Sequence, residues 1–114
     1  MITKEQKIIN ALEGQFPIKV YPERGLLAKL RETFEGFEIK PDTILEIHRM
    51  IDLGNEGGIG CDIRPIGLAA GDMKTAFLCS ITHFRIKIGE PHYEELEKYR
   101  IKRIKKLALQ NRFR

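Results

Sequence analysis

Hydrophobic and polar residues alternate through most of residues 43–88, which is the pattern of half-buried β-strands. The alternation predicts three strands, at 43–53, 58–64 and 75–88. The turn formers of the DLGNEGG stretch separate the first two strands, and so short a link leaves no room for the crossover that parallel strands need. The sequence therefore predicts one antiparallel meander, whose first hairpin closes at residues 54–58.

Two positions interrupt this alternation. Arg49 breaks the apolar face of the first strand, which indicates a bulge or an edge position there. In the third strand the apolar set changes phase after His83, from Phe77, Cys79 and Ile81 to Phe84, Ile86 and Ile88. Because a period of two cannot change phase without an irregularity, we expect a bulge or a strong twist near His83.

Helical spacing of apolar residues predicts three helices, at about 3–13, 22–36 and 91–110. Thr3 and Gln6 fit a capping box at the start of the first helix. The stretch FPIKVYP at 16–22 is bounded by prolines, which indicates an extended edge segment. The fold class is therefore α+β: a three-stranded antiparallel meander, or a four-stranded one if 16–22 joins it, in a single domain over 1–114. Two N-terminal helices and one long C-terminal helix are expected to pack on the sheet.

Charge is divided unevenly along the chain. Residues 1–97 carry 12 Lys and Arg against 16 Asp and Glu, whereas residues 98–114 carry eight basic residues and no acid. We expect the last helix to pack through Leu96, Ile101, Ile104 and Leu107, with its lysines in solvent and Tyr99 on the exposed flank. The basic end could bind RNA, DNA or another polyanion through Lys98, Lys102, Arg103, Lys105, Lys106, Arg112 and Arg114. Alternatively, bases in the last turns and acids in the first turn only match the helix macrodipole.

The outer face of the first strand is the preferred candidate for binding another protein. It mixes apolar and polar groups, as non-obligate interfaces do. The candidate residues are Glu46, His48, Met50, Asp62, His83 and Arg100. Arg100 lies within the apolar stripe of the last helix and is expected to pair with Glu97, unless it contacts an anion. The sequence thus favours a non-enzymatic interaction module that binds a protein partner or a second copy through this face, with polyanion binding as the alternative.

Enzymatic and metal chemistry receive little support from the sequence. Cys61 and Cys79 fall on core-facing strand positions, where we expect them to be buried and reduced. Catalysis by either cysteine with His83 would need an exposed thiol of low pKa, so a small enzyme with a site near His83 is the third interpretation. Ligand-type spacing is absent, and we expect no metal and no cofactor. No apolar run approaches the roughly 20 residues of a bilayer span, and the N-terminus lacks a secretory signal, so we expect a cytoplasmic protein.

Overall fold

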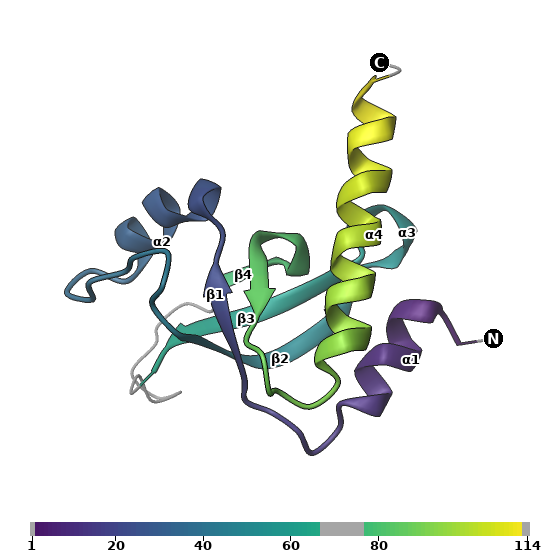
Figure 1. Cartoon of the computed structure of the whole chain (residues 1–114), viewed down its shortest axis with the longest axis horizontal. Coiled ribbons are helices and arrows are strands. Elements are labelled where there is room, and N and C mark those ends of the chain that lie inside the picture. Colours follow the sequence, from purple (N-terminus) through teal and green to yellow (C-terminus); the bar gives the residue numbers. More distant parts are fainter. Residues whose placement is uncertain (1, 67–76, 113–114) are drawn as a thin grey trace.

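Helices pack around a curled, five-stranded antiparallel sheet in the computed structural model, which describes residues 2–66 and 77–112 (Figure 1). The helices are α1 (Lys4–Ala11), α2 (Leu27–Thr33), α3 (Gly54–Gly57) and α4 (Tyr93–Arg112). The strands are β1 (Ile18–Pro22), β2 (Leu45–Asp52), β3 (Ile59–Pro65), β4 (Phe77–Ser80) and β5 (Phe84–Ile86). A short 3-10 turn at Arg24–Leu26 precedes α2. A second one, at Ile81–His83, joins β4 to β5. The predicted α+β class is confirmed, and the predicted number of strands is wrong.

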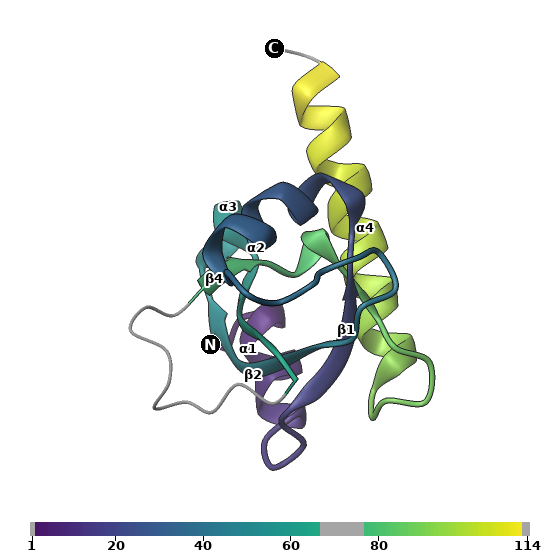
Figure 2. The same ribbon diagram turned by 90° about the vertical axis from the view of Figure 1, so that its left-hand side faces the viewer.

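The connection between the two edge strands makes the sheet curl. The strand order is β4-β3-β2-β1-β5, so β4 and β5 form opposite edges although only Ile81–His83 separates them in the chain. The four residue steps from Ser80 to Phe84 can reach about 14 Å. The outer strands of a flat five-stranded sheet would lie about 19 Å apart. The sheet must therefore bend round, as it does in Figure 2.

The predicted meander is present as β2, β3 and β4, and the irregularity expected at Arg49 is a bulge. Ile47 pairs with Ile63 and Arg49 with Asp62, which leaves His48 as the extra residue. A bulge inverts the face of every residue after it. Met50, expected on the outer face, is consequently in the core and only 5% exposed, whereas Leu53 is 46% exposed. The placement of Met50 on an outer interaction face was therefore wrong.

The irregularity expected near His83 is larger than a bulge. β4 ends at Ser80, whose Oγ accepts a hydrogen bond from the Thr82 backbone N–H at 3.3 Å and so caps the 3-10 turn. Phe84 then points into the core and begins β5, which pairs with β1 rather than with β3. The predicted break is confirmed, but the prediction of one strand over 75–88 is wrong. Its first residues, 75 and 76, lie outside the described residues.

β1 is an interior strand, not the edge segment that its prolines suggested. It pairs with β2 through Ile18 and Ile47 and with β5 through Val20 and Ile86. Pro22 is its last residue, where a missing N–H is tolerated. The second helix consequently starts with the 3-10 turn at Arg24–Leu26, and not at Pro22 as predicted. With Ile18 and Val20 fully buried, β1 contributes directly to the core.

The N-terminus of α1 is tied to the end of β2. Thr3 Oγ1 accepts a hydrogen bond from the Gln6 backbone N–H at 2.9 Å and donates one to Asp52 Oδ2 at 2.5 Å. Half of the predicted capping box is thus confirmed, whereas the Gln6 side chain donates to Asn10 Oδ1. Asp52 Oδ1 also accepts from the Gly54 backbone N–H. The hydrogen bond from Thr3 and then that from Gly54 lower the pKa of Asp52 below its ordinary value.

This lowered pKa gives Asp52 a defined influence on stability. A carboxyl whose pKa is lower in the folded state stabilises the fold above the unfolded pKa, near pH 4, and loses this contribution as the pH falls through the folded value. We expect Asp52→Asn to lower the melting temperature at pH 7, by an amount that shrinks steadily below about pH 4. Thermal unfolding of both proteins across this range checks the expectation. A difference that is the same at pH 7 and in acid would contradict it.

The face of α4 that packs against the rest of the protein is not the one that its apolar pattern predicted. Leu96 and Tyr99 are buried, but Ile101 and Ile104 are 44% and 40% exposed. The predicted packing of Ile101 and Ile104, and the predicted exposure of Tyr99, are therefore wrong. The C-terminal half of the helix projects beyond the sheet in Figure 1.

Two arginines occupy the packed face of α4 in place of the isoleucines. Arg100 Nε donates to Glu97 Oε2 at 2.6 Å, which confirms the predicted pair. Arg103 donates to the Glu56 backbone carbonyl at the end of α3. Long arginine stems can cover apolar surface while their guanidinium groups keep polar partners. The contact of Arg103 ties this face of α4 to the end of α3, whereas the pair of Arg100 with Glu97 lies within α4 itself.

A candidate polyanion-binding groove between α1 and α4

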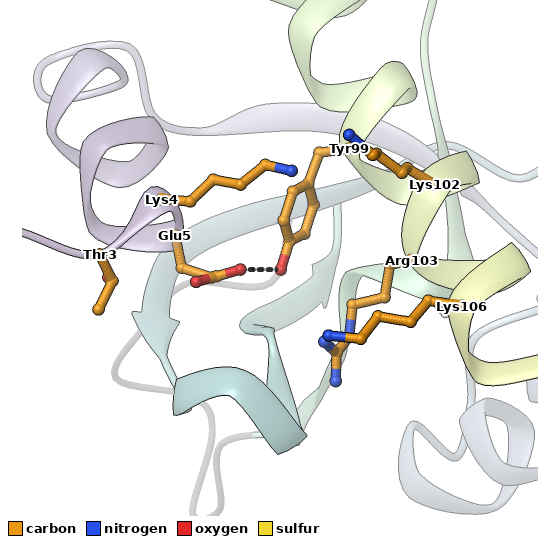
Figure 3. A pocket seen from close by; sticks show the side chains of 7 residues that line it. All are labelled: Thr3, Lys4, Glu5, Tyr99, Lys102, Arg103 and Lys106. Atoms are coloured by element: carbon orange, nitrogen blue, oxygen red, sulfur yellow. Dashed lines mark hydrogen bonds between the residues drawn. The ribbon is translucent and has the colours of Figure 1, made fainter. Parts of the chain in front are cut away.

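Two adjoining cavities of about 490 and 370 Å³ lie between α1 and α4. Lys4, Tyr99 and Lys102 line both cavities, so the two adjoin along one seam between α1 and α4. We call it the α1–α4 groove; Figure 3 shows the larger cavity. The lining residues are Thr3, Lys4, Glu5, Lys7, Ile8, Glu95, Lys98, Tyr99, Lys102, Arg103 and Lys106. Residues from the two ends of the chain therefore make a single site.

The floor of the groove is a buried polar cluster. Glu5, Tyr99 and Arg103 are all buried. The Tyr99 hydroxyl donates a hydrogen bond to Glu5 Oε2 at 2.8 Å, which Figure 3 shows as a dashed line. Burial, and then the neighbouring Glu5 carboxylate, raise the pKa of Tyr99. The phenol thus stays protonated and can serve as the donor to Glu5 at neutral pH.

The rim of the groove consists of exposed lysines from both helices. Lys98, Lys102 and Lys106 recur every four residues along α4, which places them on one side at intervals of about 6 Å along the axis. Lys4 and Lys7 come from α1, and Lys4 Nζ lies 5.6 Å from the centroid of the Tyr99 ring. Glu5 and Glu95 are the only acids among the lining residues, and Glu5 accepts the hydrogen bond from the Tyr99 hydroxyl. The groove therefore has a strong excess of positive charge.

The helix macrodipole does not account for this arrangement. Basic residues at the C-terminal end of α4 are favoured by the dipole, as the sequence indicated. Lys4 and Lys7, however, lie at the N-terminal end of α1, where the dipole favours acids. They also add to the positive charge of the α4 lysines across the groove. The dipole therefore accounts for the basic end of α4 but not for the lysines of α1.

The residues proposed from the sequence for polyanion binding are only partly brought together. Lys98, Lys102 and Lys106 line the groove, and Lys105 is exposed but lines neither cavity. Arg103 belongs to the buried floor, because its guanidinium is held by the Glu56 carbonyl. The Arg112 side chain and the whole of Arg114 lie outside the described part of the structure.

The proposed interaction face does not form one exposed surface. Met50, Asp62 and Arg100 are buried, and Asp62 accepts a hydrogen bond from Arg64 at 3.2 Å. The predicted outward placement of Asp62 was wrong because β3 is covered on both of its faces over Ile59–Ile63. Glu46 and His48 are half-buried, with Glu46 Oε1 3.4 Å from His48 Nε2, and His83 is exposed on the 3-10 turn.

The thiols have the opposite character to that of catalytic nucleophiles. Burial raises the pKa of Cys79 to about 12 and raises the pKa of Cys61 well above its ordinary value. Cys61 is buried as predicted, whereas Cys79 is half-buried. A reactive cysteine needs a lowered pKa and access to solvent. These shifts give no support to a cysteine-dependent site near His83.

The sequence reasoning missed Lys4, Lys7 and Glu5 as site residues. Their one visible signal is a pair of lysines in the first turn of a helix, against the macrodipole. Their neighbours on α4 lie more than 80 positions away in the chain. The local spacing of apolar and polar residues carries no information about a contact between α1 and α4.

Comparisons of the chain with protein-family models, with curated proteins and with solved structures gave no match. Within residues 2–66 and 77–112, no helix combines the length and apolar character needed to cross a membrane. In the same part of the chain, no group of three or more His, Cys, Asp or Glu side chains is placed to hold a metal ion. The α1–α4 groove is therefore the feature from which a function can be inferred.

Proposed function

We propose that the protein binds the phosphodiester backbone of a nucleic acid in the α1–α4 groove. The observation that supports this most strongly is that lysines from both ends of the chain line one groove, including two that the helix dipole disfavours. Lysine neutralises phosphate as a point charge, and release of the condensed counterions drives such binding.

The spacing of the charges favours a repeating anion over a single small one. Lys98, Lys102 and Lys106 form a regular row along α4, and the two cavities follow each other along the same side of the helix. A chain of phosphates could contact this row one after another. A small anion would fill one position and leave the other lysines unneutralised.

The groove offers little for reading bases. Tyr99, the one aromatic residue among the lining residues, is buried under Lys4 and bonded to Glu5, so its ring is not an open stacking platform. The rim carries lysines, which contact phosphate as point charges, and the lining residues include neither Asn nor Gln. We therefore expect binding that depends on charge and not on sequence.

Binding of a protein partner through the sheet face, the interpretation preferred from the sequence, is less well supported. Met50 was the one apolar side chain proposed for that face, and it is in the core. Glu46 and His48 are half-buried and lie 3.4 Å apart. Among the lining residues of the groove, six Lys and Arg outnumber the two carboxylates of Glu5 and Glu95, and the groove is the better candidate.

Direct titration tests the proposal. Fluorescence anisotropy of a labelled single-stranded oligonucleotide of mixed sequence should show binding at low salt, with similar affinity for a second, unrelated sequence. If Lys4, Lys7, Lys98, Lys102 and Lys106 each contact a phosphate, the logarithm of affinity should fall with the logarithm of salt at a slope of about −3.5. Absence of binding at the lowest salt would refute the proposal, because electrostatic attraction is strongest there.

A further inference from the structure

The two cysteines of the chain stand directly opposite each other in the sheet. β3 and β4 pair in antiparallel register, with Cys61 aligned to Cys79. Side chains at aligned positions of such a pair lie on the same face of the sheet. Their Cα atoms are separated by roughly 4.5 or 5.5 Å, depending on the hydrogen-bonding pattern. Both distances fall within the range of about 4.4–6.8 Å that a disulfide bond requires.

The thiols of Cys61 and Cys79 differ in their exposure to solvent. Cys61 is fully buried on an interior strand, between β2 and β4. Cys79 is half-buried and lies on β4, which is an edge strand of the sheet. Of the two thiols, Cys79 therefore keeps some exposure to solvent, whereas Cys61 has none.

We propose that Cys61 and Cys79 form a modification site at which a small-molecule disulfide, such as oxidised glutathione, produces a reversible intrachain disulfide. In the first step the thiolate of Cys79 attacks one sulfur of the reagent, and one glutathione leaves as its thiolate. In the second step the thiolate of Cys61 attacks Sγ of Cys79, and the second glutathione leaves. The two cysteines lose two protons and two electrons, and the reagent is reduced to two molecules of glutathione.

The resulting bond would fasten β4 to its neighbour. β4 has only four residues and pairs with β3 alone, since it is an edge strand. A covalent link at Cys79 holds the strand in register independently of its hydrogen bonds. Because burial raises the pKa of both cysteines, the thiolate fraction is small and the reaction is slow near neutral pH. The rate of the first step should accordingly rise about tenfold for each pH unit in this range.

Mass spectrometry of the native protein tests this site. After incubation with oxidised glutathione at mildly alkaline pH and an acid quench, we expect the wild type to lose the mass of two hydrogen atoms and to remain monomeric. Cys61→Ser should instead retain one glutathione on Cys79, because no second thiol is present to displace it. Cys79→Ser should stay unmodified until denaturant is added. Circular dichroism shows whether either variant has lost its fold.

Three results would overturn the proposal, and the wild-type protein alone can give each of them. The first is a wild type that carries a stable glutathione adduct on Cys79, since the two sulfurs would then be out of reach of each other. The second is a disulfide between two chains. The third is a wild type that reacts only in denaturant, even after prolonged incubation.

Discussion

Reversing the charge of both Lys102 and Lys106 is expected to weaken binding of a single-stranded oligonucleotide about 100-fold at roughly 50 mM salt. Lys102 lines both cavities of the groove and Lys106 lines the larger one. At this salt concentration each lost phosphate contact costs close to tenfold in affinity, and the new carboxylates add repulsion. The melting temperature should hardly change, because both side chains are exposed.

The matched control for Lys102→Glu with Lys106→Glu is Lys105→Glu with Lys29→Glu. Both pairs change the net charge equally and alter exposed lysines. Lys105 lies on α4 outside the cavities, and Lys29 lies on α2, far from α1 and α4 in Figure 1. The control should lose affinity by no more than a few-fold. If it loses as much as the groove variant, binding depends on net charge and has no particular site.

Gly58→Ala is expected to destabilise the fold by about 2–4 kcal/mol. Gly58 has φ +69° and ψ −133°, a backbone conformation outside the left-handed helical region that costs a residue with a Cβ atom about 1–3 kcal/mol. A Cβ at this position would also lie 2.6 Å from Arg103 Nε. Arg103 cannot move away easily, because it is buried and its guanidinium donates to the Glu56 carbonyl. The substitution therefore disturbs the contact between α3 and α4 as well as the turn itself.

Gly36→Ala serves as the control that separates the cost of the backbone conformation from the cost of the contact with Arg103. Gly36 also has a positive φ, of +90°, but a Cβ there would meet no atom within 4 Å. We expect this variant to lose only the conformational term, about 1 kcal/mol. Chemical denaturation of the three proteins measures the difference. Equal losses in the two variants would show that the approach of Arg103 to Gly58 contributes nothing.

Local patterns predicted the middle of the sheet because its pairing is local. The turn at 54–58 determines the pairing of β2 with β3, and Cys61 and Cys79 fall opposite each other in the next hairpin. Even the burial of Met50 could have been found, since the bulge was expected and a bulge inverts the residues that follow it. The pairing of β1 with β5 could not, because it joins segments that are far apart in the chain and alternation carries no information about distant partners.

The rotation of α4 was also beyond the reach of periodicity. Around the helix axis, α4 has two stripes of residues that could face the sheet. One contains Ile101 and Ile104, and the other contains Tyr99 and Arg103. The choice between them depends on partners from elsewhere, such as the Glu56 carbonyl for Arg103. The same rotation brings Lys102 and Lys106 beside α1. The α4 side of the groove could therefore be predicted from the sequence as a basic helix. The α1 side could be found only from the three-dimensional structure.

The central claim is that lysines of α1 and α4 act together on one polyanion, and the salt dependence of a Lys7→Glu variant tests it most directly. Lys7 is exposed on α1 and lines the groove, and an acid in this turn suits the helix dipole, so the fold should not suffer. Measured beside wild type and a Lys29→Glu control, the variant should show a salt slope that is shallower by about 0.7 and a weaker affinity at low salt. A slope and affinity equal to those of the wild type would contradict the claim, because α1 would then take no part in binding.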